Sequence, residues 1–152
     1  MRFVLPLLIA FTLLAGAVAQ DDGHDVLLAR VRFGRFVTSD NCAFCHSNAT
    51  SAGGLRDNQG RPVAPYDLWR ATMMANAARD PFFLAAMAAE TTHNPSRKKE
   101  IEAKCLRCHA PMAHEEVRRR TGGKDSIGAD VFKIQSPFRA LAMDGVSCTL
   151  CH

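Results

Sequence analysis

Three short stretches share one pattern: CAFCH at residues 42–46, CLRCH at residues 105–109 and CTLCH at residues 148–152. In each stretch two cysteines stand three positions apart, and a histidine follows the second cysteine. Together the stretches use all six cysteines of the 152-residue chain. Because no cysteine is left over, we expect this pattern to decide how the chain folds.

A Cys-x-x-Cys-His unit is typical of a site where haem is attached covalently. Its two thiols lie close enough together to form thioethers with the two vinyl groups of one porphyrin. The histidine is then held beneath the iron as a neutral imidazole, the proximal axial ligand. We therefore predict three covalent haem c groups. The predicted attachment residues are Cys42, Cys45, Cys105, Cys108, Cys148 and Cys151, and the predicted proximal ligands are His46, His109 and His152.

Three other uses of paired cysteines compete with haem attachment. A structural zinc site needs four nitrogen or sulfur ligands, so three Cys-x-x-Cys pairs would leave one pair without a partner. A thioredoxin-like redox pair has no use for a following histidine. Three disulfides are possible in an exported chain, but they leave the histidines unexplained. Covalent haem is the interpretation that accounts for the cysteines and the histidines together.

Residues 1–19 have the pattern of a secretory signal peptide. Arg2 gives a short basic start, residues 3–15 form an almost unbroken apolar run, and small residues precede Gln20. The apolar run is short for a membrane-spanning helix, although a retained N-terminal membrane helix is the alternative. Because haem is attached covalently on the outer side of the bacterial cytoplasmic membrane, we predict a periplasmic or otherwise exported bacterial protein. Once the signal peptide is removed, we expect no stable membrane insertion.

The remaining residues 20–152 suffice for one small domain but not for a large hydrophobic core. Haems are large, flat and apolar, so side chains can pack around them instead. We predict a mainly α fold of short helices and long loops around covalently bound haems, with little or no sheet. The formal net charge of +4 is cancelled or reversed by about two propionate charges per haem. We therefore predict no nucleic-acid partner.

Apolar spacing and helix start and stop signals predict where the helices lie. Helices are expected over residues 25–37, 65–79, 82–92, 96–104, 114–120 and 137–143. Asp80 is the expected N-cap of one helix, with Pro81 at its first position. Residues 47–64, rich in Gly, Asn and Ser, predict a loop. Residues 132–134 are expected to be extended.

Two basic clusters, at residues 97–99 and 118–120, stand out in this part of the chain. They could form solvated helix faces or neutralise haem propionates. The alternative is a docking patch for an acidic redox partner.

The segments around the motifs resemble a family of bacterial multihaem c-type cytochromes. The resemblance rests on YDLWRATMM at 66–74, RDP at 79–81, CLRCHAPM at 105–112 and DGVSCTLCH at 144–152. It covers about residues 40–152. These strings are similar to those in relatives of the tetrahaem cytochrome c that accepts electrons from hydroxylamine oxidoreductase. The resemblance implies electron exchange with redox partner proteins.

Members of that family usually continue beyond the third motif, whereas this sequence stops at His152. We therefore expect it to be an N-terminal fragment. The alternative is a natural short cytochrome with one exposed haem at its tail.

The function of such a protein depends on the sixth ligand of each iron. Two strong axial ligands leave only electron transfer, whereas an open position permits substrate chemistry. The distal candidates are His93, His114 and Met74. Two of them also have a simpler role: His93 could cap carbonyls at a helix end, and Met74 could pack in an apolar face. The other spare histidine, His24, lies close to the expected mature terminus.

We expect an exported multihaem c-type cytochrome that carries electrons rather than a catalyst. The alternative is part of a multihaem oxidoreductase acting on small nitrogen or sulfur compounds at an open haem. A third possibility is an attachment or sensor module of a larger exported protein.

Overall fold

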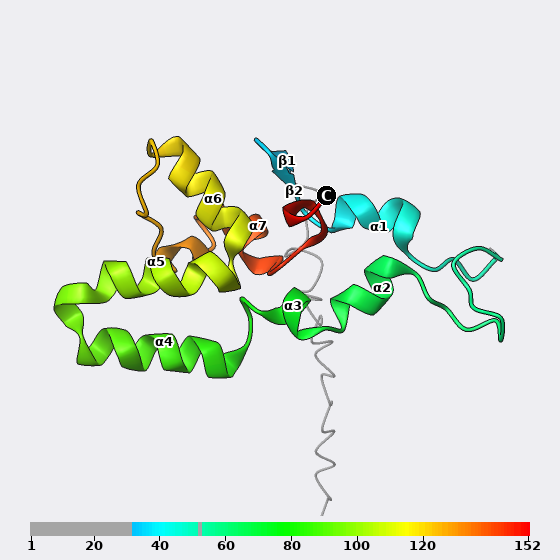
Figure 1. Cartoon of the computed structure of the whole chain (residues 1–152), viewed down its shortest axis with the longest axis horizontal. Coiled ribbons are helices and arrows are strands. Elements are labelled where there is room, and N and C mark those ends of the chain that lie inside the picture. The colour runs from blue at the N-terminus through cyan, green and yellow to red at the C-terminus, as the bar shows by residue number, and fades with distance from the viewer. Residues whose placement is uncertain (1–31, 52) are drawn as a thin grey trace, which may run out of the picture.

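The computed structural model of the chain describes residues 32–51 and 53–152, and this part is built mainly from short helices (Figure 1). The α-helices are α1 (Asp40–His46), α2 (Pro65–Arg70), α3 (Met73–Asn76), α4 (Pro81–His93), α5 (Lys98–His109), α6 (Pro111–Arg120) and α7 (Arg139–Met143). Short 3-10 turns add η1 (Pro95–Arg97), η2 (Ala129–Phe132) and η3 (Cys148–Leu150). Strands β1 (Arg32–Phe33) and β2 (Phe36–Val37) form one antiparallel pair. The predicted mainly α fold is confirmed.

The hydrophobic core of the described residues lies among α4, α5, α6 and α7. Helix α5 packs against both α4 and α6, and α6 packs against α7. Leu106, Met112 and Leu141 are fully buried there, and β2 contributes Phe36. Helices α1 and α2 lie at the other end of the molecule, with the third motif between the two ends (Figure 1). The core therefore supports the second motif directly, and the first and third motifs lie at its margin.

Several helix boundaries follow local signals in the sequence. Asp80 accepts a hydrogen bond from the backbone N–H of Phe82 at 3.0 Å, so it caps α4 as predicted. The helix predicted over 65–79 is divided, because the Thr72 hydroxyl caps a new helix by accepting from the N–H of Ala75. This second cap competes with a continuous helix.

Two predicted elements differ from the structure in the described residues. Residues 32–37 form the β1–β2 hairpin rather than the end of a helix over 25–37, whose first part, 25–31, lies outside the described residues. The hairpin turns at Gly34, where φ is +45°, a conformation that favours glycine. Residues 132–134 form no strand: Phe132 ends η2, and Lys133, although its backbone is extended, donates its N–H to the carbonyl of Asp130.

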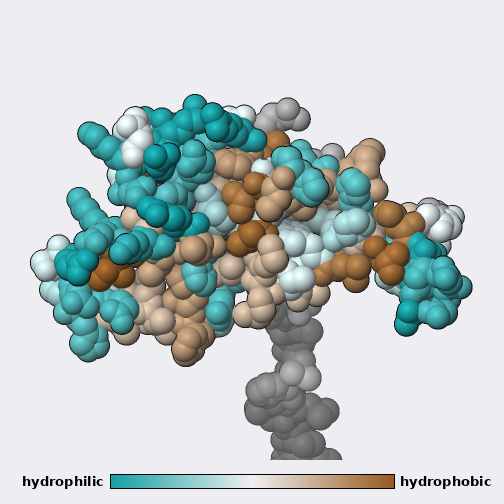
Figure 2. Space-filling view, viewed as in Figure 1, coloured by the Kyte–Doolittle hydropathy of each residue, from teal (hydrophilic) through white to brown (hydrophobic). Residues whose placement is uncertain are grey.

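The surface divides by polarity in the view of Figure 2. Hydrophilic residues gather over α5 and α6, whereas hydrophobic residues are frequent over α4 and near α1 and α2. Several large apolar side chains are exposed, among them Phe44 of the first motif at 78 % and Phe82 of α4 at 81 %. Of the helices within residues 32–51 and 53–152, none is long and apolar enough to cross a membrane. The predicted signal peptide at 1–19 lies outside the described residues.

Candidate functional site

Each of the three cysteine motifs lies in a helical turn. The first lies in α1, the second ends α5, and the third begins η3. Cysteines three positions apart on a helix face the same side, which is the arrangement needed to attach one porphyrin at two points. All six cysteines are free thiols, and the second cysteine of each motif is exposed. The disulfide alternative therefore has no support in this structure.

The first and third motifs line one cavity of about 590 Å³. Its walls include the motif residues Cys42, His46, Cys148, Cys151 and His152. Further walls come from the apolar and aromatic side chains of Pro65, Tyr66, Trp69, Met74 and Val146. A mostly apolar cavity with few polar groups is typical of a cofactor site. Two motifs that are 106 positions apart in sequence therefore meet at one site.

Asp144 joins the first motif to the third. Its carboxylate accepts a hydrogen bond from the backbone N–H of Ser39 at 2.9 Å and another from the Ser39 hydroxyl at 2.5 Å. Ser39 precedes α1, and Asp144 precedes the third motif by four residues. Thr149 adds a second link, because its hydroxyl contacts both the N–H and the carbonyl of Val37.

Helices α2 and α3 are attached to the same segment. The Trp69 indole N–H donates to the carbonyl of Val146 at 2.9 Å, and the N–H of Val146 donates to the carbonyl of Met74 at 2.9 Å. Gly145 permits this close approach, since its φ is +64° and an added Cβ would lie 2.5 Å from the Met74 carbonyl oxygen. These contacts place Trp69 and Met74 at the cavity.

The second motif presents its histidine in a defined orientation. The Nδ1 atom of His109 lies 2.8 Å from the carbonyl oxygen of Ala77, so Nδ1 carries the proton and donates. The ring also stacks on Phe83, with 3.6 Å between the centroids and 5° between the planes. A hydrogen bond at one ring nitrogen leaves the other, Nε2, free for a metal. Sequence reasoning missed this contact between Phe83 and His109.

The remaining ligand candidates lie in different surroundings. His93 is exposed at the end of α4, and its Nδ1 lies 2.8 Å from the carbonyl of Ala89, as the carbonyl-capping alternative describes. Met74 is 52 % exposed and lines the cavity shared by the first and third motifs. His24 lies outside the described residues.

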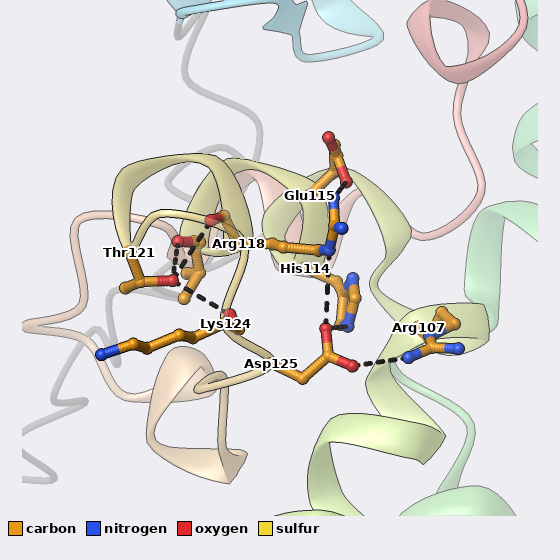
Figure 3. Close-up of polar contacts among 8 residues, drawn as sticks. Arg107, His114, Glu115, Arg118, Thr121, Lys124 and Asp125 are labelled. Carbon is orange, nitrogen blue, oxygen red and sulfur yellow. Dashed lines mark hydrogen bonds and ion pairs between the residues drawn. The ribbon is translucent and has the colours of Figure 1, made fainter.

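His114 is buried on α6 and faces Asp125 (Figure 3). Its Nε2 lies 3.4 Å from Asp125 Oδ1, and this atom has no well-aligned hydrogen-bond partner. Burial lowers the pKa of His114, although the Asp125 carboxylate opposes that shift. Asp125 also accepts a hydrogen bond at 2.6 Å from Arg107, which lies inside the second motif. Sequence reasoning missed Asp125, which no local pattern marks.

The two basic clusters are largely paired with carboxylates. Arg97 binds Glu100 at 2.8 Å. Arg119 and Arg120 lie 2.9 and 3.9 Å from Glu116, which is fully buried. Burial disfavours the Glu116 carboxylate, but hydrogen bonds from the Arg35 N–H and Arg119 outweigh it and lower its pKa. The clusters therefore stabilise the helices as well as charging the surface.

Within the described residues, no three His, Cys, Asp or Glu side chains gather closely enough to hold a metal ion by themselves. No curated protein and no solved structure matches the chain. The family described as cytochrome c554 and c-prime matches residues 41–152, a range that includes all three motifs. The chain therefore belongs to the cytochrome c554 and c-prime family, c-type cytochromes that bind haem c covalently and transfer electrons.

Proposed function

We propose that this chain is an exported electron carrier with three covalent haem c groups, one at each Cys-x-x-Cys-His motif. The observation that supports it best is the geometry of the motifs: three helical turns, each with two free thiols on one side and a histidine after the second. Cys42, Cys45, Cys105, Cys108, Cys148 and Cys151 would form the thioethers. His46, His109 and His152 would bind the irons.

The surroundings of the motifs fit haem. The cavity between the first and third motifs is mostly apolar, and Trp69 and Tyr66 offer flat walls to a porphyrin. At the second motif the Ala77 carbonyl fixes the tautomer of His109 and leaves Nε2 available. The haems supply iron that cycles between ferric and ferrous states. The protein fixes their spacing and adjusts each potential through ligands, burial and nearby charge.

The shared cavity would bring the haems of the first and third motifs close together. Groups attached to the first and third motifs would share one space, whereas the second motif lies beside α4, on the other side of α3. We propose that electrons pass between a redox partner protein and this haem pair by way of neighbouring haems. The resemblance to relatives of the hydroxylamine oxidoreductase acceptor makes an oxidoreductase of small nitrogen compounds the first partner to test.

Intact mass spectrometry tests the number and attachment of the haems. The protein, expressed with its haem-attachment machinery in the periplasm, should retain three haem masses after acid–acetone extraction. A variant with Cys105→Ala and Cys108→Ala should retain two, because only the second motif is removed. Colour that is lost on extraction would contradict covalent attachment, and a mass with fewer than three haems would contradict the count.

Electron paramagnetic resonance distinguishes carrier from catalyst. Low-spin signals alone from the oxidised protein would indicate six-coordinate iron and support the carrier. A high-spin signal that shifts on adding hydroxylamine or sulfite would instead support the oxidoreductase alternative.

A further inference from the structure

Asp144 is the buried acidic residue that bridges the two ends of the shared cavity. Its relative exposure is 0 %, and its two carboxylate oxygens accept from the N–H and the hydroxyl of Ser39. Ser39 is itself fully buried at the start of α1. The bond spans 105 residues of sequence. This contact between Ser39 and Asp144 therefore holds the first motif close to the third.

Hydrogen bonds partly offset the cost of burying the Asp144 carboxylate. Burial raises the pKa of Asp144, and hydrogen bonds from Ser147 and Ser39 reduce this shift without cancelling it. The Ser147 hydroxyl lies without a well-aligned partner, but it is close enough to favour the ionised form. Because the Ser39 N–H can only donate, at least one carboxylate oxygen must accept. A protein that needed only a neutral hydrogen-bond acceptor here could use asparagine.

The electrostatic effect of Asp144 reaches the cavity. Burial, the Cys148 thiol and then the Asp144 carboxylate raise the pKa of the Cys42 thiol. Burial and Asp40 raise the pKa of Tyr66, another cavity wall, and Asp144 adds to that effect. A charge that acts on Cys42 also acts on a group bonded to Cys42, since Coulomb interactions in a buried site are weakly screened.

We infer that Asp144 is a positioning residue for two haems: it holds the first and third motifs together, and its negative charge lowers the reduction potentials of the haems attached there. This inference rests on the proposed function. A nearby negative charge stabilises ferric iron over ferrous iron, because the ferric state carries one more positive charge. The second motif has a different acidic neighbour, Asp125, which pairs with Arg107.

The central experiment compares Asp144→Asn with wild type in the three-haem protein. Asparagine keeps the shape and can still accept from Ser39, but it removes the charge. Spectroelectrochemical titration should show that two of three midpoints rise. At a fixed potential the ferrous-to-ferric ratio of each of these two haems should increase about tenfold, which corresponds to a midpoint shift of about 59 mV for a one-electron couple. The third midpoint should stay in place.

Asp125→Asn is the matched control, because it removes a carboxylate beside the second motif instead. Asp125 is 39 % exposed, so its charge is better screened. It should move only the midpoint that Asp144→Asn leaves unchanged, and by a smaller ratio. If the two variants move the same midpoints, or if Asp144→Asn moves none, the inference is overturned.

Asp144→Glu keeps the charge and covers the case in which Asp144→Asn fails to mature. If the glutamate variant carries three haems with nearly wild-type potentials and the asparagine variant does not mature, the charge is required and the inference holds. If both fail, only the packing at this position matters and the inference is wrong. The intact mass of the wild type distinguishes failure of the proposed function from failure of this inference. A wild type without three haems contradicts the proposed function. Unchanged potentials in a haem-loaded Asp144→Asn variant contradict the inference alone.

Discussion

Replacing Gly145 with alanine should be among the most damaging single changes outside the motifs. The residue lies between Asp144 and the third motif, and its φ of +64° is in the left-handed region. An added Cβ would lie 2.5 Å from the carbonyl oxygen of Met74 and 2.7 Å from that of Ala75. Both obstructing atoms belong to the backbone of α3, so no side chain can turn aside.

The expected loss of stability has three parts. Left-handed backbone costs an L-residue about 1–2 kcal/mol. Overpacking against α3 adds about 1–3 kcal/mol, since Ala75 is fully buried. If α3 moves away, the hydrogen bond from the Val146 N–H to Met74 is lost, at about 1 kcal/mol. We expect a decrease of about 3–6 kcal/mol in the free energy of unfolding, in the range that single changes rarely reach.

Gly122→Ala is the control that isolates the steric part. Its φ is +68°, and a Cβ there would meet nothing within 4 Å. Chemical denaturation of the two haem-loaded variants, followed by circular dichroism, should give a decrease of only about 1–2 kcal/mol for Gly122→Ala. Equal destabilisation by the two alanines would refute the close approach of α3 to the segment before the third motif.

Three other predictions test separate contacts. His109→Ala should remove the low-spin signal of one haem, whereas Met73→Leu at an exposed site should keep all signals in electron paramagnetic resonance. Burial, and then a hydrogen bond to Asp40, raise the pKa of Tyr66 from 10.0 to about 12. The free energy of unfolding should therefore fall as the pH rises between these two pKa values. Denaturation measured across this pH range should show that Tyr66→Phe abolishes the fall. The pKa of Glu116 is lowered from 4.5 in the folded protein, so its carboxylate stabilises the fold above pH 4.5, and this stabilisation is lost as the pH falls. Glu116→Gln should therefore reduce the decrease in melting temperature on acidification.

Local signals made part of the structure predictable. Asp80 and Pro81 indicated the start of α4, because capping and proline effects act over a few residues. The cysteine spacing fixed the candidate haem sites for the same reason. The division of the helix at Thr72 was missed, because a threonine in an apolar helical pattern is compatible with the interior of a helix as well as with an N-cap position.

Long-range contacts account for what the sequence did not reveal. The β1–β2 hairpin depends on Glu116, 81 residues away, which accepts a hydrogen bond from the Arg35 N–H. The meeting of the first and third motifs depends on Asp144 and Ser39, and no spacing rule connects these two residues. The contact of His114 with Asp125 likewise arises only when α6 and the following loop have packed.

Under the proposed function, the contrast between the motifs predicts an order for haem enclosure. The contact from His109 of the second motif to Ala77 spans only 32 residues, so this contact can form early. The first motif precedes the second in the chain, yet the contacts of Ser39 and Val37 beside it require residues 144–149. Closing so long a loop is slow compared with local helix formation. If haem is attached at the first motif, as we propose, that haem would thus be among the last to be enclosed, and it would remain accessible until the third motif docks.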